Sequence, residues 1–346
     1  MHGSLFLATD IRYNLIASVF APRKDTIMID WTRTALIFPG QGSQQVGMGA
    51  DLAAQYPEAA AAFAEADSIL GYPLSRLCFE GPEEDLNSTI NTQPALFVMG
   101  VAVLRVLSAA LGAPPRPRFV AGHSLGEFTA LAAADALKFA DGVRLVRERG
   151  RLMRQAGEQN PGAMAAVLGL DANTVRAICA AASQQTGAPL VLANDNCDGQ
   201  LVISGDKAAL EAALPLATER GAKRVVPLAV SVASHSPLME TITPAFRETL
   251  AATPFDPPAV PVIGNVNAAP LTSVAAIRDE LGAQLTSTVR WTESVQYMRS
   301  QGVETFIEIG PKDVLTGLVK RIDRDAKRIT LNSADSVAAF LAGQMS

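Results

Sequence analysis

One pentapeptide constrains the fold of this chain more than any other feature. Residues 122–126 read Gly-His-Ser-Leu-Gly; a short apolar segment, 118–121, precedes them, and a segment rich in helix-forming residues, 125–137, follows. Strand, Gly-x-Ser-x-Gly and helix in that order are typical of a sharp turn that exposes its serine. The helix N-terminus favours negative charge beside that serine. The pattern therefore predicts Ser124 as a nucleophile.

A serine nucleophile needs a base, and the chain offers few candidates. A serine hydroxyl attacks poorly at neutral pH unless a neighbouring group takes its proton. The sequence contains three histidines. His2 lies in the N-terminal tail, and His123 adjoins Ser124 on a turn that should point it away from the hydroxyl. By elimination His235 is the candidate base, and the alternative is a histidine that caps the following helix.

A glycine-rich segment, 38–44, reads Phe-Pro-Gly-Gln-Gly-Ser-Gln and follows the short apolar segment 34–37. A dinucleotide-binding loop would need a third glycine where Gln45 stands, and the Gly-Lys-Ser/Thr of a phosphate-binding loop is missing. Gln41 between two glycines instead indicates backbone and amide donors placed near a reacting carbonyl oxygen. An ordinary glycine turn is the alternative.

The segment 141–156 predicts a helix with an apolar face and a run of arginines. Most of these arginines are expected to be solvated or paired with nearby acids. One that turned inward would bind a carboxylate, because a guanidinium group matches a carboxylate with two parallel hydrogen bonds. Helical spacing does not decide which one. The candidates are Arg144, Arg147, Arg149, Arg151 and Arg154.

Composition agrees with an α/β enzyme and excludes several other classes. The chain has 346 residues, 49% of them hydrophobic, enough for a large core, and apolar strands alternate with alanine-rich helices. Three cysteines without a Cys-x-x-Cys pair predict neither a disulfide framework nor a zinc site, which fits a reducing cytoplasm. Apolar runs shorter than a membrane span and a net charge of −5 argue against membrane insertion and non-specific nucleic-acid binding.

Several short blocks, taken in order, resemble the malonyl-CoA:acyl carrier protein transacylases of fatty-acid synthesis and the related acyltransferase domains of polyketide synthases. The resemblance runs from Thr32 to Ser333, and so many blocks in order are more specific than any one motif. The blocks are Phe38-Pro-Gly-Gln-Gly-Ser-Gln44, Thr92-Gln-Pro-Ala-Leu96, Gly122-His-Ser-Leu-Gly-Glu127, Arg147-Glu-Arg-Gly150, Gly162-Ala-Met-Ala-Ala166, Ser231-Val-Ala-Ser-His235, Gln284-Leu285 and Glu308-Ile-Gly-Pro311.

The resemblance implies a role for each matching residue. Ser124 looks like the acylated nucleophile, and His235 looks like its general base. The family orients that histidine with a backbone carbonyl, which here would belong to Gln284. Arg149 matches the arginine that binds the free carboxylate of malonate.

The resemblance extends to the oxyanion site and the pocket. Gln41 would line the site near the oxyanion, and the N–H of Leu125 would be the oxyanion donor. Asn194 and Asn196 match a pocket loop that contains asparagine. Ala233 departs from the proline of many fatty-acid members, which bears on side-chain selectivity.

The implied reaction is a ping-pong transfer of malonyl from malonyl-CoA to the phosphopantetheine thiol of an acyl carrier protein, through a malonyl-serine ester. The resemblance implies no bound cofactor, a cytoplasmic enzyme and a monomer. Acyl carrier proteins are acidic, so docking needs a basic patch. Lys223 and Arg224 are candidates, as are Lys320 and Arg321, and the alternative is that all four are ordinary solvated side chains.

Other functions remain open at this stage. A free-standing acyltransferase of a polyketide synthase and the transacylase of malonate decarboxylase differ from the preferred function in their carrier protein. A serine esterase of the α/β-hydrolase type would share Ser124 and His235, and would place a carboxylate such as Asp195 between them in the sequence. A non-enzymatic scaffold would be expected to lack Ser124 or His235.

The domain prediction follows from the same pattern. Residues 1–31 lie outside the resemblance and are expected to be an N-terminal extension that need not be ordered, or a stretch upstream of the true start. Residues 32–156 and 231–346 are expected to form a large α/β-hydrolase-like subdomain around a parallel sheet. Residues 157–230 read strand–helix–strand–strand–helix–strand, the order of a ferredoxin-like subdomain, which would be inserted between Ser124 and His235.

Overall fold

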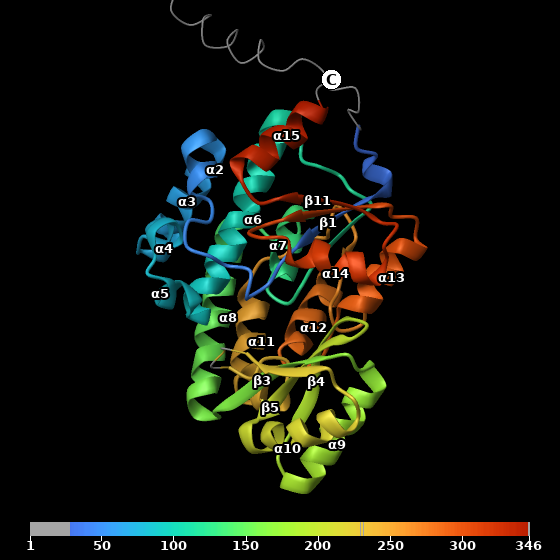
Figure 1. Ribbon diagram of the computed structural model, residues 1–346. Coiled ribbons are helices and arrows are strands. Elements are labelled where there is room, and N and C mark those ends of the chain that lie inside the picture. The colour runs from blue at the N-terminus through green and yellow to red at the C-terminus, as the bar shows by residue number, and fades with distance from the viewer. Residues whose placement is uncertain (1–27, 229, 231, 345–346) are drawn as a thin grey trace, which may run out of the picture.

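The computed structural model describes residues 28–228, 230 and 232–344, and it contains two sheets surrounded by helices (Figure 1). The predicted α/β class is confirmed. In the view of Figure 1 the larger sheet lies in the upper part of the molecule and the smaller sheet lies below it. Helices α9 and α10 cover the lower side of the smaller sheet.

The larger sheet has the strand order β11-β10-β1-β2-β7-β8, and its neighbours are parallel except for β7 and β8. Alternate residues of β1 belong to two different cores: Leu36 and Phe38 to one, Ala35 and Ile37 to the other. A parallel sheet buried on both faces explains why its strands read as continuous apolar runs. The strands are β1 (Thr34–Phe38), β2 (Phe119–Gly122), β7 (Val262–Ile263), β8 (Pro270–Leu271), β10 (Thr305–Ile309) and β11 (Lys327–Leu331).

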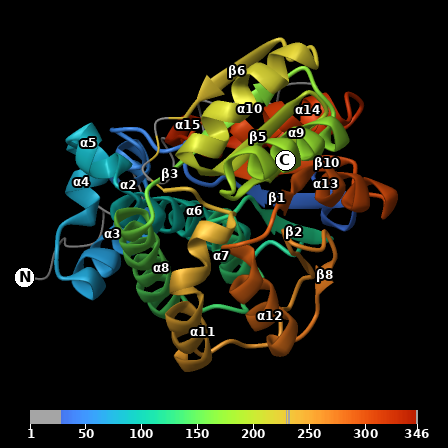
Figure 2. The ribbon, with the colours of Figure 1, turned by 90° about the horizontal axis from the view of Figure 1, so that it is seen from below.

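Helices cover both faces of this sheet, as the view from below makes clear (Figure 2). The helices of this larger part of the molecule are α2 (Ala50–Gln55), α3 (Pro57–Leu70), α4 (Leu74–Glu80), α5 (Glu83–Asn87), α6 (Thr89–Leu111), α7 (Gly126–Ala133), α8 (Phe139–Gln159), α11 (Thr243–Ala252), α12 (Val274–Gln284), α13 (Trp291–Ser300), α14 (Val314–Ile322) and α15 (Ala334–Gln344), with 3-10 helices η1 (Trp31–Arg33) and η2 (Pro237–Ile242). In the described part of the chain, α6 alone is long and apolar enough to cross a membrane, but 72% of its most apolar window is buried inside the protein.

The smaller sheet has the order β6-β3-β5-β4-β9, with antiparallel neighbours except for β4 and β9. Along the chain its elements follow the predicted order of strand, helix, strand, strand, helix and strand. Asp171 and Asp206 begin the two helices by accepting hydrogen bonds from backbone N–H groups of the first turn. The elements are β3 (Gly162–Leu168), α9 (Ala172–Thr186), β4 (Leu190–Cys197), β5 (Gln200–Asp206), α10 (Lys207–Glu219), β6 (Arg224–Pro227) and β9 (Val289–Arg290).

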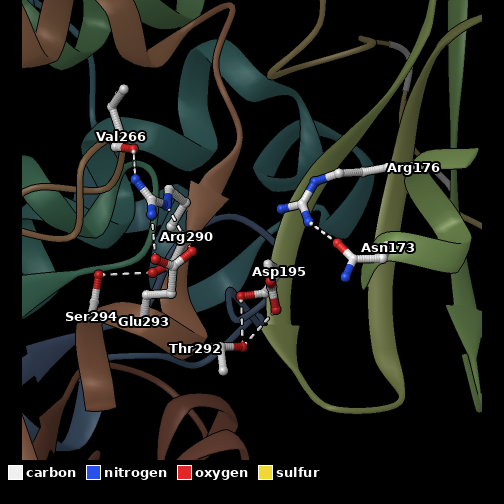
Figure 3. A network of polar contacts seen from close by, with 8 residues as sticks. All are labelled: Asn173, Arg176, Asp195, Val266, Arg290, Thr292, Glu293 and Ser294. Atoms are coloured by element: carbon white, nitrogen blue, oxygen red, sulfur yellow. Dashed lines mark hydrogen bonds and ion pairs between the residues drawn. The ribbon is translucent and has the colours of Figure 1, made fainter. Parts of the chain in front are cut away.

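Strand β9 connects the smaller sheet to the part of the chain that forms the larger sheet. It lies between α12 and α13 in the sequence, yet it pairs with β4, so that Asn194 is opposite Val289 and Asp195 is opposite Arg290. The hydroxyl of Thr292 donates to Asp195 Oδ1 at 2.6 Å, while Arg290 forms an ion pair with its neighbour on α13 (Figure 3). The smaller sheet is therefore fixed to the larger part by backbone pairing and by side chains.

The predicted N-terminal extension lies mostly outside the described residues. Residues 28–31, its last four, pack against the end of the chain: the N–H of Ile29 donates to Gln344 Oε1 at 2.9 Å. The ring of Trp31 meets the ring of Phe340 edge-on, with 6.4 Å between centroids. These contacts tie residues 28–31 to the folded part of the protein.

Candidate active site

Ser124 stands on a sharp turn between β2 and α7. A Cβ added to Gly122 would collide with the backbone of Gly126, and a Cβ added to Gly126 would collide with the carbonyl of Phe38. Both glycines are therefore required by the close approach of β1, β2 and α7. Ser124 itself has a φ of 51°, in the left-handed region that side chains rarely adopt, as expected of a nucleophile held in a strained turn.

His235 is in hydrogen-bond contact with Ser124. Its Nε2 lies 2.8 Å from Ser124 Oγ, and its Nδ1 lies 2.8 Å from the backbone carbonyl of Gln284. A carbonyl can only accept, so Nδ1 carries the hydrogen and Nε2 is free to accept the serine proton. Gln284 is the last residue of α12, where helix carbonyls lack an intrahelical partner. An esterase triad would have placed a carboxylate at this position.

The surroundings of His235 keep its ring neutral. Its side chain is buried, and burial followed by the nearby charge of Arg149 lowers the pKa of His235 to about 3. An imidazole with so low a pKa is unprotonated near pH 7, the form that a general base needs. The electrostatics and the hydrogen bonds thus favour the same protonation state.

Arg149 is the arginine of α8 that points inward. Its side chain is 1% exposed, whereas Arg144, Arg151 and Arg154 are about half exposed or more and form ion pairs along the helix. Arg147 lies between these extremes and binds the carbonyl of residue 90 and side chains of residues 72 and 91. The tertiary structure thus identifies which arginine of α8 is buried, which helical spacing alone did not.

The guanidinium group of Arg149 faces the nucleophile. Nη2 lies 3.2 Å from Ser124 Oγ and donates to Gln284 Oε1 at 2.8 Å, and Nη1 donates to Gln93 Oε1 at 2.9 Å. Burial lowers the pKa of Arg149 to about 10, against the opposing effect of Glu127, so the group stays charged near neutrality. No carboxylate among the described residues forms an ion pair with it. A buried, unpaired cation is costly, and a carboxylate on a bound ligand would compensate its charge.

Gln41 and Leu125 are the two residues predicted to lie near the oxyanion. Gln41 is exposed, and its Oε1 accepts a hydrogen bond from Thr89 Oγ1 at 2.7 Å. Leu125 directly precedes α7. Its N–H therefore belongs to the donors at the start of a helix that have no carbonyl partner within the helix. No contact within the described residues places Gln41 on the nucleophile itself, so its role near the oxyanion stays a prediction.

The smaller sheet reaches the site through β4. Asn196 Oδ1 lies 2.8 Å from Nε2 of His123, whose ring therefore points away from the Ser124 hydroxyl as predicted. Asn194 and Asn196 are both nearly buried. This hydrogen bond connects β4, which carries both asparagines, with the residue that precedes the nucleophile.

Two residues at the site were not predicted from the sequence. Asn265, after β7, accepts the N–H of Ser124 at 2.6 Å through Oδ1 and donates to the carbonyl of Gly122 at 2.7 Å through Nδ2. It therefore braces both sides of the turn, and no sequence pattern pointed to it. Gln93, which holds Arg149, stood inside one of the blocks of resemblance without an assigned role.

The described residues contain no group of three or more histidines, cysteines, aspartates or glutamates placed to hold a metal ion. Cys78, Cys179 and Cys197 are buried free thiols. The charged and polar groups that converge on Ser124 are those of a nucleophile, a neutral base and a cation. Together they suit attack on a carbonyl of a ligand that also carries a negative charge.

Comparison with known proteins assigns residues 35–345 to the acyl transferase domain family. The malonyl CoA-acyl carrier protein transacylase of Escherichia coli (strain K12) is 47% identical over 311 residues, which span 90% of this chain and 99% of that protein. The same-named protein of Bacillus subtilis (strain 168) is 45% identical, over 88% of this chain and 95% of its own length.

Two solved structures are similar along almost their whole length. The acyl carrier protein S-malonyltransferase of Vibrio cholerae superposes with a TM-score of 0.85 and 46% identity, over 89% of this chain and 99% of that one. A malonyl-transacylase solved in complex with its type II PKS acyl-carrier protein has a TM-score of 0.86 and 42% identity, over 90% of this chain and 99% of that one.

Proposed function

Because this chain belongs to the acyl transferase domain family, we propose that it transfers a malonyl group from malonyl-CoA to the phosphopantetheine thiol of an acyl carrier protein. One observation carries the proposal. The guanidinium group of Arg149 is buried and forms no ion pair with a described carboxylate. It donates a hydrogen bond to Ser124 Oγ, the same atom that His235 contacts. A nucleophile, a base and a carboxylate receptor thus meet at one atom, as transfer of a dicarboxylate half-ester requires.

In the first half-reaction, His235 Nε2 takes the proton of Ser124 as Oγ attacks the thioester carbonyl of malonyl-CoA. The carbon–sulfur bond then breaks, and His235 donates the proton to the coenzyme A sulfur. A malonyl ester remains on Ser124. The tetrahedral oxyanion is stabilised by the Leu125 N–H and by a second donor near Gln41. The dipole of α7 adds to this stabilisation because Ser124 lies at its N-terminus.

In the second half-reaction, the carrier's phosphopantetheine thiol gives its proton to His235, and its sulfur attacks the ester. The ester carbon–oxygen bond breaks, and the proton returns to Ser124. Arg149 binds the free malonyl carboxylate throughout, so acetyl-CoA should be a poor substrate. Neither half-reaction needs a bound cofactor.

We further propose that the larger sheet belongs to a hydrolase-like subdomain of residues 32–156 and 231–346, and the smaller one to an inserted ferredoxin-like subdomain of residues 157–230. The chain order of β3 to β6 and the antiparallel pairing of the smaller sheet support this division. One element crosses it: β9 lies in the hydrolase-like part and pairs with β4. Asn196 would then face the substrate from the inserted part.

For the carrier, we propose that Lys223, Arg224, Lys320 and Arg321 form one basic docking patch. All four are exposed. Arg321 donates a hydrogen bond to Gln200, the first residue of β5, directly after the turn that joins β4 to β5. Lys223 packs beside the neighbouring turn at residue 169, whose N–H donates to the carbonyl of residue 199 at 2.9 Å. The patch therefore lies at the end of the strand that carries Asn196 to the site.

A second candidate differs in the carrier. The structural relative bound to a type II PKS acyl-carrier protein favours a role in polyketide synthesis as the alternative to fatty-acid synthesis. Both candidates share the chemistry on Ser124. Transfer rates to a fatty-acid carrier and to a polyketide carrier, both in the holo form, would separate them.

Intact-mass spectrometry after brief incubation with malonyl-CoA or acetyl-CoA tests the proposal. The wild type should gain a malonyl group that Ser124→Ala cannot gain, and should gain little acetyl. Arg149→Ala should lose the preference for malonyl, since removing one side of a buried charge pair costs about 3–5 kcal/mol. Arg151→Ala, an exposed arginine of the same helix, is the matched control and should behave as wild type. Release of free coenzyme A without an adduct would instead indicate a hydrolase.

A further inference from the structure

Beneath Ser124 lies a cluster of buried polar groups that take no direct part in acyl transfer. Glu127 lies in the first turn of α7, three residues after Ser124, and Glu280 and Gln284 lie four residues apart on one face of α12. All three side chains are at most 4% exposed. Buried carboxyl groups are rare unless they are hydrogen-bonded, so their contacts carry information about what they hold in place.

The side-chain amide of Gln284 is at the centre of this cluster. Its Nε2 donates to Glu127 Oε2 at 2.8 Å and to the carbonyl of Ser124 at 3.0 Å, while its Oε1 accepts from Arg149 Nη2 at 2.8 Å. The opposite orientation would turn two N–H donors toward a guanidinium group, which cannot accept. It would also turn a carbonyl oxygen toward two oxygen acceptors. The contacts therefore define a single orientation.

We propose, on the basis of the function proposed above, that Glu127 is a positioning residue: its carboxyl group fixes the Gln284 amide, and through that amide it aims Arg149 at the malonyl carboxylate. Arg149 and the backbone of Ser124 also contact this amide, but both belong to the reacting centre. The Glu127 carboxyl group instead contacts the Gln284 amide and forms no hydrogen bond with the reacting groups themselves among the described residues. Its loss should therefore alter which acyl group is accepted and leave the serine and its base in place.

The turn at residues 264–266 holds the Glu280 carboxyl group. Glu280 Oε1 accepts the N–H of Val266 at 2.6 Å, and a Cβ on Gly264 would lie 2.8 Å from the Glu280 carboxyl group. Asn265, between them, braces the turn at Ser124. Burial, and then the charge of Glu280, raise the pKa of Glu127 well above its usual range. A glutamine at this position keeps an oxygen acceptor at the same reach as Glu127 Oε2, so it should hold the Gln284 amide in the same way.

The test compares three substitutions: Glu127→Gln, which keeps an oxygen acceptor at the same reach; Glu127→Leu, which removes it; and Glu127→Asp, which draws it back by one methylene. The quantity measured is the rate constant for acylation of Ser124 by malonyl-CoA divided by that for acetyl-CoA. We expect this ratio to fall about tenfold or more in Glu127→Leu, less in Glu127→Asp, and to stay within about threefold of wild type in Glu127→Gln. If Glu127→Leu does not fold, Glu127→Asp decides.

A merely structural role would lower stability and slow both substrates equally, without changing the ratio. Glu308→Gln is the matched control, because this buried carboxyl group accepts N–H groups at the start of α14, at 3.0 and 2.7 Å, away from Arg149. It should lower the melting temperature and leave the ratio unchanged. The proposed role of Glu127 would be overturned if the folded Glu127→Leu and Glu127→Asp variants kept the wild-type ratio of malonyl to acetyl rate constants. It would also be overturned if this ratio fell as far in Glu127→Gln as in Glu127→Leu. A wild type that does not prefer malonyl-CoA would contradict the proposed function instead.

Discussion

The two sides of the candidate site are built on different principles. On the side of the larger sheet, hydrogen bonds link Ser124, His235 and Arg149 to one another and to two glutamines from separate segments, Gln93 and Gln284, and the base and the cation are buried. The smaller sheet contributes one hydrogen bond, which Asn196 Oδ1 accepts from His123 Nε2, and carries basic residues at its exposed edge. Groups that react need fixed geometry, whereas groups that meet a separate protein must lie on the surface.

The sharpest test of this difference compares two histidines. We expect His235→Ala to slow acylation of Ser124 by roughly 10²–10⁴-fold, because general-base catalysis contributes that much. His123→Ala removes the hydrogen bond with Asn196 and the ring contact with Trp291, neither of which involves Ser124 Oγ, and should cost less than about tenfold. Rapid-quench measurement of malonyl adduct formation would check both. Similar losses in the two variants would show that the smaller sheet matters to the chemistry as much as the larger one.

The pH dependence of acylation sharpens the same contrast. An imidazole with the ordinary pKa of 6.5 would be only about 3% neutral at pH 5, a loss of roughly thirtyfold. The pKa of His235 is lowered to about 3, so its acid limb lies at lower pH and the rate at pH 5 should stay within about twofold of that at pH 7.

Because the charge of Arg149 contributes to this lowering, Arg149→Met should raise the pKa of His235 and move the acid limb to higher pH. Acylation rates of folded protein across this range, checked by circular dichroism, supply the measurement. A wild-type half-maximal rate near pH 6.5 would mean that the buried environment does not act on His235.

The basic patch predicts a smaller effect, confined to the second half-reaction. Replacing Lys320 and Arg321 together by glutamate should raise the KM for the holo carrier about tenfold at low salt, and the effect should shrink as salt screens the charges. Formation of the malonyl-serine ester should not change. Arg144→Glu, an exposed arginine on α8, is the control for a change of net charge. An unchanged KM in the double variant would move the docking site elsewhere.

The sequence predicted what depends on local pattern and missed what depends on contacts between distant segments. The glycines around Ser124 indicated a turn because only small residues fit there, and apolar runs indicated the strands β1 to β6 but not β7 to β11. Helical spacing could not select Arg149, whose partner Gln93 is 56 residues away. Asn265 contacts Ser124 from 141 residues away. Strand β9, a two-residue segment far along the chain from the rest of the smaller sheet, pairs with β4 of that sheet for reasons that no window of sequence contains.

That pairing supports the last and smallest prediction. Thr292→Val removes the hydroxyl that donates to Asp195 across the junction of the two sheets, and should lower the free energy of unfolding by about 1 kcal/mol. Thr174→Val removes a similar threonine–aspartate bond, of 2.7 Å, within the smaller part. Chemical denaturation should show a loss in both. Because Asp195 precedes Asn196, only Thr292→Val should also change the KM for the carrier, by about twofold to fivefold. If Thr174→Val changed this KM equally, loss of stability rather than loss of alignment between the sheets would be the cause.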